Sequence, residues 1–228
     1  MMKVSIVYIF PNGGANGYEE LAFRFLQTYH EHPPGMDHES IIVCNGTPAS
    51  EETKFYFGSL PNPVFLDHDG SGYDIGGFQA ASRAHPADMM VFFGSTAYFK
   101  HAGWLARMVQ AFQTHGDTVY GVMGNQGQLN VGVYPHIRTT GFWLSSALFN
   151  QYPVQVTRPE QRYAFEHGAD GLTSWAIQRG LQPWIVSMAA GDWVLQACDS
   201  IPEGFHRGNQ ENLLAGDRLS RPPYWPVE

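Results

Sequence analysis

Short apolar runs alternate with amphipathic stretches through the first half of the chain. Five runs are each followed at once by Pro, Asn, Asp or Gly: residues 4–10, 40–44, 63–66, 89–93 and 119–123. Such runs are typical of parallel strands that are covered on both faces. Apolar spacing and stop residues predict three helices between them, over residues 19–30, 74–83 and 103–114. Asp74 is the expected N-cap of the second helix. Strands that alternate with helices predict an α/β fold with a mostly parallel sheet.

The pattern is less regular in the second half of the chain. Residues 137–148 begin like a strand and end like a helix, residues 169–179 predict a helix, and residues 184–188 predict a last strand. From Asp199 onward the chain is rich in Gly, Asn, Pro and charge, and we expect it to wrap over one face. No repeat, low-complexity block or linker interrupts the sequence, so we predict one domain over residues 1–228.

Composition narrows the classes of protein to consider. Charged residues make up 15% of the 228 and aromatic residues 14%, with 25 Gly and 15 Pro, which favours ordered, ligand-facing loops on a globular scaffold. The net charge of −8 argues against the basic surface that a nucleic-acid-binding protein needs. No apolar run approaches the ~18 residues of a membrane span.

Cysteine usage and the start of the chain indicate a compartment. Cys44 and Cys198 are too few and too far apart for a disulfide framework, which fits a reducing environment. The apolar start runs directly into Pro-Asn-Gly-Gly at residues 11–14, which indicates a buried first strand and not a signal peptide. We therefore predict a cytoplasmic protein without a membrane span.

The polar clusters after the predicted strands are expected to carry the site, because ligands bind at the carboxyl ends of strands in open α/β sheets. Four clusters are in this position: residues 11–17, 45–47, 67–74 and 94–96. Residues 70–76 look like a dinucleotide-binding fingerprint, but their spacing is Gly-x-Gly-x-x-x-Gly and they follow the third run instead of the first. Dinucleotide binding is therefore not favoured.

Three stretches of the sequence, in their order along the chain, resemble the motifs of a known family. They read Gly-Tyr-Asp-Ile-Gly-Gly-Phe at residues 72–78, Thr-Gly-Phe-Trp-Leu-Ser at 140–145 and Phe-Glu-His-Gly at 165–168. With the order of strands, they make about the first 190 residues similar to GT-A fold glycosyltransferases, such as the bacterial enzymes that build capsule, O-antigen and rhamnose-rich polysaccharides. The resemblance implies transfer of a sugar from a nucleotide-sugar donor to a glycan or lipid-linked saccharide acceptor.

The resemblance also implies which parts of the chain bind each substrate. Within a single GT-A domain, residues 1–125 are expected to bind the donor, residues 126–198 to hold the acceptor and the catalytic groups, and residues 199–228 to cover the site. The implied donor-binding positions are Phe10, Asn12, Asn45, Asp74, Gly76, Gly94, Ser95, Thr96, Arg138, His206 and Arg207. The expected partners are the nucleotide-sugar donor and the saccharide acceptor, and no nucleic acid is expected to bind.

A general base and an acceptor cleft follow from the same resemblance. Glu166 best matches the acidic residue that takes the proton of the acceptor hydroxyl in inverting members, and Asp170 is the second choice. A carboxylate within ~3 Å of a sugar hydroxyl can accept its proton as the new bond forms. Tyr98, Trp104 and Trp143 are expected to contact the acceptor sugar. The alternatives are a solvated or helix-stabilising carboxylate for Glu166, and a core position for Trp143.

One departure from the family concerns metal binding. Family members usually carry an Asp-x-Asp after the fourth strand to hold a divalent cation, but residues 92–97 read Phe-Phe-Gly-Ser-Thr-Ala. We therefore predict transfer that requires no cofactor, with backbone N–H groups or a cation such as Arg138 stabilising the leaving group. Binding of Mn²⁺ or Mg²⁺ is the alternative, with Asp67, Asp69 and His206 as ligands. A polar turn is the more common use of such an Asp-His-Asp sequence.

Two other classes of function stay open at this point. A non-catalytic nucleotide- or sugar-binding module would account for the missing Asp-x-Asp. A sugar nucleotidyltransferase has a similarly wound sheet but normally carries a basic, Gly-rich loop after its first strand. Residues 11–17 contain no Lys or Arg, which counts against that class.

Overall fold

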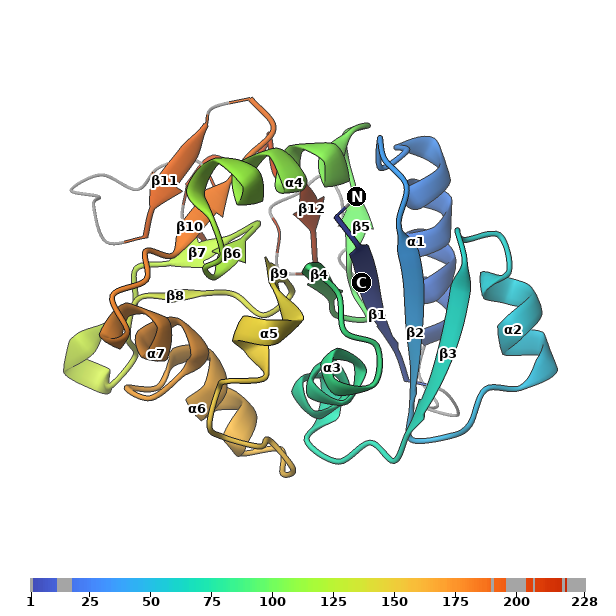
Figure 1. Cartoon of the computed structure of the whole chain (residues 1–228), viewed down its shortest axis with the longest axis horizontal. Coiled ribbons are helices and arrows are strands. Elements are labelled where there is room, and N and C mark those ends of the chain that lie inside the picture. Colours follow the sequence, from blue (N-terminus) through green and yellow to red (C-terminus); the bar gives the residue numbers. More distant parts are fainter. Residues whose placement is uncertain are drawn as a thin grey trace.

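The computed structural model describes residues 2–11, 18–189, 191–195, 204–206, 208–218 and 220, which form an eight-stranded central sheet (Figure 1). The strands stand in the order β11-β10-β6-β9-β4-β1-β2-β3. Neighbouring strands pair in parallel among β1 (Val4–Phe10), β2 (Glu39–Asn45), β3 (Pro63–His68) and β4 (Met89–Phe93). The same holds for β6 (Tyr120–Gly121) and β10 (Trp184–Val186), whereas β9 (Gly141–Leu144) and β11 (Asp192–Val194) pair in the antiparallel direction. The predicted α/β fold with a mostly parallel sheet is confirmed.

Helices cover both faces of this sheet. One face carries α1 (Tyr18–Glu31), α2 (Glu51–Phe57) and α4 (Trp104–His115), and the other carries α3 (Tyr73–Ala84), α5 (Ser146–Phe149), α6 (Gln161–His167) and α7 (Leu172–Gln178). In Figure 1, α4 lies above the strands and α3, α5, α6 and α7 lie below them. Tyr8 and Phe10 pack with the first helix layer, and Val7 and Ile9 with the second. Because successive side chains of β1 point to opposite buried faces, its sequence is an apolar run without alternation.

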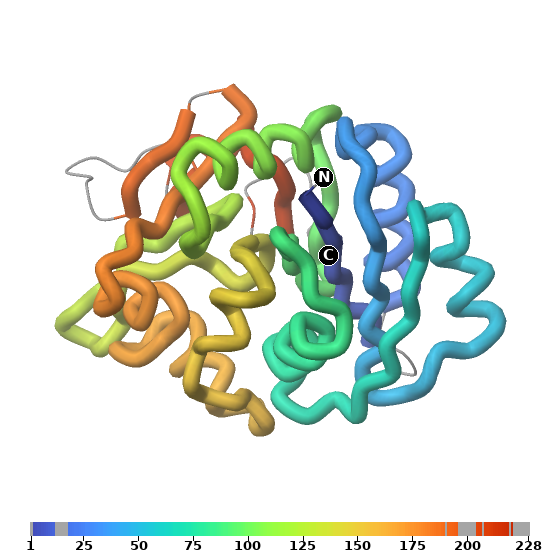
Figure 2. Tube along the Cα trace, in the orientation of Figure 1, coloured from blue at the N-terminus to red at the C-terminus, as the bar shows by residue number. Residues whose placement is uncertain are grey.

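Two short ribbons lie outside the main sheet. β7 (Gly124–Asn125) pairs with β8 (His136–Ile137), and the loop between them contains a 3₁₀ turn, η1 (Leu129–Val131). β5 (Tyr98–Phe99) pairs with β12 (Ala215–Gly216). Figure 2 shows this late part of the chain, in red, beside the green β5. A strand from the middle of the sequence therefore takes its partner from the C-terminal segment, by which we mean the described residues from Gly204 onward.

Further contacts hold the C-terminal segment in place. The Lys100 Nζ donates to the Gln210 carbonyl oxygen over 2.8 Å. The backbone of Phe205 bridges to Gly124, and that of Leu213 bridges to Ser187. These contacts tie the segment to β5, to β7 and to the chain that follows β10.

Some element boundaries differ from those expected. The helix expected over residues 74–83 is α3, which begins at Tyr73 after Gly72 in the left-handed conformation. Asp74 therefore lies in the first turn of α3, and the prediction that it is the N-cap is wrong. The helix expected over residues 169–179 begins only at Leu172, and the separate helix α6 precedes it. Both α6 and α2 have seven residues, and each buries one large apolar side chain, so neither produces a clear helical period in the sequence.

The glycines at the start of α3 are explained by close packing. A Cβ added to Gly72 would lie 2.1 Å from the Val156 carbonyl oxygen. One added to Gly76 would lie 1.9 Å from the Ser71 carbonyl oxygen and 3.1 Å from that of Val156. Gly76 is buried against the chain itself, and this packing requires a bare backbone here. Its contact with the donor stays a prediction.

Two features bear on the predicted compartment: the lengths of the helices and the state of the cysteines. Among the described residues, no helix is long and apolar enough to cross a membrane. Cys44 is buried and free, and burial raises the pKa of its thiol to about 11. Cys198 lies outside the described residues.

Candidate functional site at the carboxyl edge of the sheet

The parallel direction of β1 to β4 brings the carboxyl ends of these strands to one edge. The last residues of the four strands are Phe10, Asn45, His68 and Phe93. β9 runs in the opposite direction, so the chain that enters β9 reaches the same edge, and Gly94 N donates to the Thr140 carbonyl oxygen over 3.4 Å. This carboxyl edge therefore brings residues 138–140 close to the turn that follows β4.

The turn of residues 94–96 follows β4, where the enzymes that the sequence resembles carry the Asp-x-Asp. The Tyr8 hydroxyl donates to the Ser95 carbonyl oxygen over 2.9 Å, and Ala97 N donates to the Gly94 carbonyl oxygen over 3.1 Å. A Cβ added to Gly94 would meet no atom within 4 Å, and Ser95 and Thr96 are half-buried. The turn is thus fixed from the core side and offers backbone groups, but no carboxylate, on its open side.

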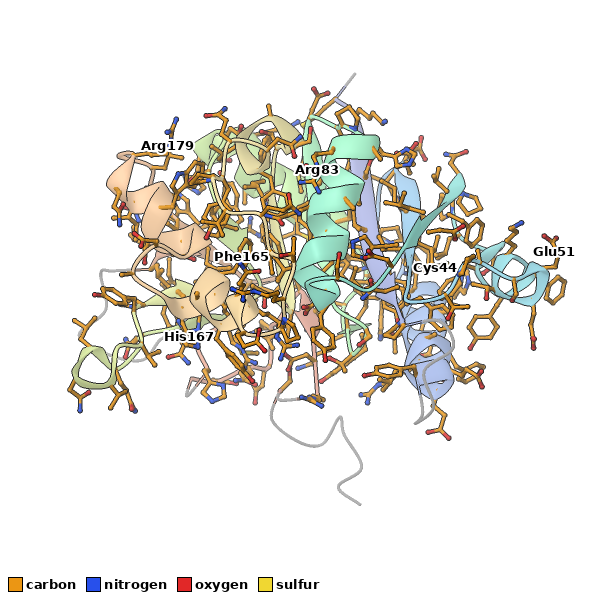
Figure 3. The ribbon with its side chains drawn as sticks, turned by 90° about the horizontal axis from the view of Figure 1, so that it is seen from below. Cys44, Glu51, Arg83, Phe165, His167 and Arg179 are labelled. Carbon is orange, nitrogen blue, oxygen red and sulfur yellow. The ribbon has the colours of Figure 1, made fainter. Side chains whose placement is uncertain are left out.

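Two carboxylates from different helices come together at the carboxyl edge, and we call them the acidic pair. Asp74 lies in the first turn of α3, and Glu166 lies in the last turn of α6. Figure 3 shows α6, with Phe165 and His167, beside the amino-terminal half of α3, whose other end is marked by Arg83. The backbone N–H of Thr139 donates to Glu166 Oε1 over 3.2 Å. Glu166 is therefore positioned by the chain entering β9 and does not stabilise a helix N-terminus, as the structural alternative had it.

The electrostatics of the acidic pair raise the pKa of Asp74. Burial raises the pKa of the Asp74 carboxyl above its ordinary value, the positive charge of Arg162 opposes this, and the negative charge of Glu166 adds to it. The Arg162 Nη1 lies 4.0 Å from Asp74 Oδ1. Two carboxylates in such different surroundings are a common arrangement in acid–base chemistry, because one can hold a proton while the other accepts one.

His136 packs behind Glu166 and was not singled out from the sequence. Its Nδ1 lies 2.7 Å from the Tyr134 carbonyl oxygen, so Nδ1 carries the proton of the neutral ring. Burial lowers the pKa of His136, and the nearby Glu166 only partly offsets this. The rings of His136 and His167 have centroids 5.7 Å apart. A buried neutral imidazole beside Glu166 adds no positive charge to it, and a His in a strand-like stretch gives no sequence signal for this role.

A second cation, Arg138, directly precedes Thr139, whose N–H binds Glu166. Its side chain is mostly buried, with Nη1 3.2 Å from His206 Nδ1 and Nη2 3.7 Å from Asp217 Oδ2. A guanidinium can only donate, so His206 Nδ1 accepts and the His206 proton sits on Nε2. Arg138 thus joins β8 to the C-terminal segment, and the carboxylate of Asp217 partly balances its charge. Arg207 and Asn12, also expected at the donor site, lie outside the described residues.

A cavity of about 170 Å³ opens at the end of β1. Its lining residues are Phe10, Glu19, Ser50, Glu52, Thr53 and Tyr56. Aromatic faces suit a flat base, and carboxylates and hydroxyls suit sugar hydroxyls, so the lining matches a nucleoside in kind. Beside it on the edge, Asn45 Oδ1 and His68 Nδ1 lie 2.6 Å apart, which orients the Asn45 amide.

The three aromatic residues expected to contact the acceptor belong to the core. Tyr98 is 1% exposed, and Trp104 and Trp143 are fully buried. Trp104 stacks on Phe99 with ring centroids 4.1 Å apart, and Trp143 stacks on Tyr120 at 5.3 Å. None of the three has a free face for a sugar, so the prediction that they form the acceptor cleft is wrong.

The residues at the carboxyl edge do not fit the divalent cation that the resemblance would imply. Residues 94–96 supply no carboxylate. The side chain of Asp69 accepts from Ser71 N over 2.8 Å, an Asx turn that lowers its pKa, and Asp67 accepts from Ala49 N over 2.8 Å. Across the described ranges, no group of three or more His, Cys, Asp or Glu could hold a metal ion. Asp67 and Asp69 thus have the turn role favoured by the sequence.

Asp170, the second choice for a base, lies in the turn between α6 and α7. Its carbonyl oxygen accepts from the Tyr152 hydroxyl over 2.9 Å, and its side chain is exposed. No contact recorded for the Asp170 carboxylate joins it to Asp74, Arg138 or Thr139. Glu166 is therefore the better positioned of the two.

The order of strands and the site at their carboxyl ends define an α/β protein of the GT-A or Rossmann-like type. No family model matches the sequence, and no curated protein sequence matches it. Similar solved structures include TarS from S. aureus, with a TM-score of 0.55 and 14% identity over 85% of this chain and 36% of TarS. A 1–349 form of TarS matches with a TM-score of 0.53 and 12% identity, over 85% of this chain and 60% of that one.

A putative glucose-1-phosphate thymidylyltransferase from Bacillus anthracis, solved with a sucrose, also has this fold. Its TM-score is 0.56, with 12% identity over 85% of this chain and 88% of that one. At such identities these likenesses show the fold. The chain spans about a third of the TarS chain and nearly all of the thymidylyltransferase.

Proposed function

We propose that this chain is a glycosyltransferase that moves a sugar from a nucleotide-sugar donor to a hydroxyl of a glycan or lipid-linked saccharide in polysaccharide biosynthesis. The observation that carries the proposal is the acidic pair, Asp74 and Glu166, at the carboxyl edge where the open turn of residues 94–96 also lies. A transferase of this kind needs a carboxylate near the acceptor hydroxyl, and N–H donors or positive charge near the donor diphosphate.

The donor is proposed to lie along the carboxyl edge from β1 to β4. The cavity lined by Phe10 and Tyr56 takes the base of the donor nucleoside, and Asn45 lies close to the ribose. The diphosphate then passes over Gly94, Ser95 and Thr96, whose open side leaves backbone groups for it to bind. Arg138 lies beyond that turn and supplies positive charge toward the departing phosphate.

Glu166 is the proposed general base of an inverting reaction. The acceptor hydroxyl gives its proton to Glu166 as its oxygen forms a bond to C1 of the donor sugar. The bond between C1 and the phosphate oxygen breaks, and the nucleoside diphosphate leaves with that electron pair. Thr139 N–H fixes Glu166 Oε1. Asp74, with its raised pKa, holds a proton more readily than an ordinary Asp and then adds no second negative charge beside the leaving group.

We also propose that transfer uses no Asp-x-Asp metal and takes place in the cytoplasm. Residues 94–96 offer a cation no carboxylate, and Asp67 and Asp69 are already engaged in the turns of their own loop. The buried free thiol of Cys44 is compatible with a reducing compartment.

The first experiment measures thermal stabilisation by nucleoside diphosphates and nucleotide-sugars, each with Mn²⁺ or with EDTA. Ligand at 100 times its Kd adds about 2.7 kcal/mol, which for a domain of this size raises Tm by about 5–11 °C. We expect one nucleotide class to stabilise the protein in EDTA. If no nucleotide stabilises the protein, the proposed donor site is refuted.

The second experiment compares Glu166→Gln with the exposed, matched variant Glu160→Gln. We expect kcat for transfer to fall by about 10²–10⁴ in Glu166→Gln, with nucleotide stabilisation unchanged, and Glu160→Gln to behave like the wild type. Full activity of Glu166→Gln would refute its role as base. Pyrophosphate release from a nucleoside triphosphate and a sugar 1-phosphate would instead identify a nucleotidyltransferase, the activity that the B. anthracis protein's name describes.

A further inference from the structure

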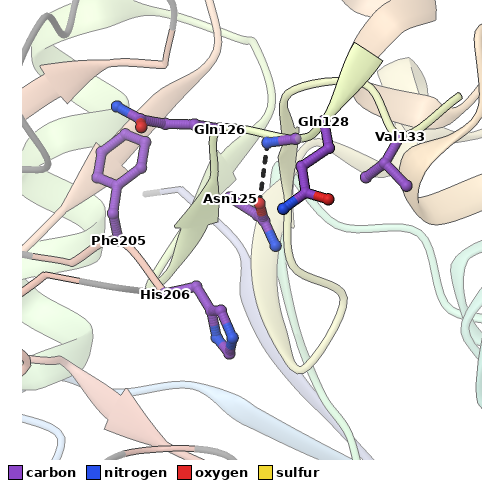
Figure 4. A pocket seen from close by; sticks show the side chains of 7 residues that line it. Asn125, Gln126, Gln128, Val133, Phe205 and His206 are labelled. Carbon is purple, nitrogen blue, oxygen red and sulfur yellow. Dashed lines mark hydrogen bonds between the residues drawn. The ribbon is translucent and has the colours of Figure 1, made fainter. Parts of the chain in front are cut away.

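A second cavity, of about 290 Å³, lies between the β7–β8 ribbon and the start of the C-terminal segment (Figure 4). Six residues line it with side chains: Asn125, Gln126, Gln128, Val133, Phe205 and His206. It is distinct from the cavity at Phe10, which lies at the end of β1 in the main sheet, whereas β7 and β8 form a separate ribbon.

The polar groups of this cavity are neutral amides and one imidazole. Asn125 Oδ1 accepts from Gly127 N over 2.9 Å, which fixes the amide and leaves its NH₂ group to donate into the cavity. Figure 4 shows the amides of Asn125 and Gln128 close together, with the His206 ring on the facing segment. Because His206 Nδ1 accepts from Arg138, its Nε2–H is a donor. Among the described lining residues there is no Asp, Glu, Lys or Arg, so the chemistry of this part of the wall suits an uncharged ligand with many hydroxyls.

The cavity walls are held by backbone hydrogen bonds before any ligand arrives. Gln128 N donates to the Val133 carbonyl oxygen over 2.7 Å, and Val133 N donates to that of Gln128 over 3.2 Å. His206 N donates to the Gly124 carbonyl oxygen over 2.8 Å, which ties the facing segment to β7. A preformed polar pocket with Val133 and Phe205 as apolar walls can bind both the hydroxyls and the C–H face of a sugar.

The cavity is connected to the acidic pair through short stretches of chain. Asn125 pairs with His136 across the ribbon, and the chain then runs through Arg138 to Thr139, whose N–H binds Glu166. Tyr134 N also donates to the His167 carbonyl oxygen over 3.0 Å, which fixes the ribbon against the end of α6. The ribbon that forms one wall of the cavity therefore continues into the chain that positions the proposed base.

We propose that this cavity is the acceptor subsite and that it takes an uncharged sugar residue of the acceptor saccharide. The inference rests on the proposed glycosyltransferase function and replaces the cleft that the sequence suggested around Trp104 and Trp143. At about 290 Å³ it is at the small end of ligand pockets, so one sugar residue enters and the rest of the acceptor stays in solvent.

The test measures binding of methyl glycosides by saturation-transfer NMR, with methyl glucuronide as the charged comparison. We expect neutral glycosides to bind, with affinity at least ten-fold weaker in Asn125→Asp and in Gln128→Ala. Asn125→Asp keeps the acceptor for Gly127 N and replaces the donating NH₂ group by a negatively charged oxygen. The matched control Asn130→Asp makes the same change at an exposed position of the same loop and should leave affinity unchanged.

The source of the sugar is separated by comparing methyl with octyl glycosides. Leu129 and Val131, 66% and 63% exposed, project from η1 next to the cavity. Tighter binding of the octyl glycoside that Leu129→Ser abolishes supports the subsite and identifies a lipid-linked acceptor. Equal binding of the two supports it with a glycan acceptor. Unchanged affinity in both Asn125→Asp and Gln128→Ala, or preference for the glucuronide, overturns the proposal.

Two further measurements on the same variants distinguish a failure of the subsite from a failure of the proposed function. They are the thermal stabilisation of the protein by nucleotides and the slow hydrolysis of the donor by water. If donor binding and hydrolysis are present but the cavity variants bind glycosides as the wild type does, only the subsite fails. If no donor binds, the transferase function fails whatever the glycosides do.

Discussion

Gly72 and Gly103 occupy the same position in two helices, and only one of them has room for a side chain. Gly72 precedes α3 with φ 70° and ψ 12°, and Gly103 precedes α4 with φ 80° and ψ 10°, each without a side-chain cap. A Cβ at Gly103 would meet no atom within 4 Å, whereas one at Gly72 would lie 2.1 Å from the Val156 carbonyl oxygen. Substitution by Ala therefore separates the conformational cost from the steric one.

The expected costs differ by a measurable amount. The left-handed conformation costs Ala about 1–2 kcal/mol, and the loss of Gly freedom in the unfolded chain returns about 0.4–1 kcal/mol. Gly103→Ala should therefore destabilise by about 1 kcal/mol. Gly72→Ala must also push Val156 away from Gln79, which bonds to Val154 O at 2.8 Å and Val156 N at 2.9 Å. Two such bonds add about 1–3 kcal/mol, so Gly72→Ala should cost about 2–4 kcal/mol.

Thermal and urea unfolding of the two variants test this argument. At about 2–4 °C per kcal/mol, Gly103→Ala should lower Tm by roughly 2–4 °C and Gly72→Ala by roughly 4–16 °C, with similar urea m-values. Because Tyr73 and Asp74 follow Gly72 directly, Gly72→Ala should also weaken nucleotide stabilisation, which Gly103→Ala should not. Equal destabilisation by the two substitutions would refute the steric reasoning.

Three further changes test other parts of the site. Tyr56→Leu should weaken nucleotide binding about ten-fold in a thermal-shift titration, whereas Phe55→Leu, 88% exposed on the same helix, should not; equal effects would displace the nucleoside from this cavity. Asp74→Asn should be more stable than the wild type near pH 7. A carboxyl whose pKa is raised by folding binds its proton more tightly in the folded state and costs stability as pH rises through that pKa, so the difference should vanish below about pH 4. Trp143→Phe should leave the KM for the acceptor unchanged, because the ring is buried in the core. It should lower the free energy of unfolding by less than about 1.5 kcal/mol, because the Trp143 N–H has no hydrogen-bond partner among the described residues. A raised KM would return Trp143 to the acceptor site.

The main sheet could be predicted because its strands are buried on both faces. β1, β2 and β4 are short continuous apolar runs, and each ends at the residue types that mark turns. The same reasoning failed for Tyr98 and Trp104, which follow a strand as loop residues would. Trp104 is a core residue because it packs on Tyr29, Phe93 and Phe99. Tyr98 is one because β12, from far along the chain, pairs with β5 and places Gly216 against its ring. A pairing between such distant segments leaves no local periodicity in the sequence.

The two halves of the proposed site differ in how visible they are in a sequence. Glu166 stands out in the sequence because it lies in a stretch that resembles a family motif. The proposed acceptor cavity does not stand out, because it consists of amides such as Asn125 and Gln128 in a Gly-containing loop, which have the composition of any exposed turn. His206 was assigned to the donor, but the structure places it on the wall of this cavity, bonded to Arg138.

The pairing of β5 with β12 also sets the order of events while the protein is being made on the ribosome. Asp217, which partly balances the charge of Arg138, is added about 80 residues after it, and at 5–20 residues per second that interval lasts about 4–16 s. Throughout this interval the edge of β5 lacks its partner β12, and such edges invite pairing with other chains. The nascent polypeptide therefore passes through a period in which β1 to β4 can already be assembled while β12 is still missing. In a cell, this protein should depend on chaperones mainly during that last stage of synthesis.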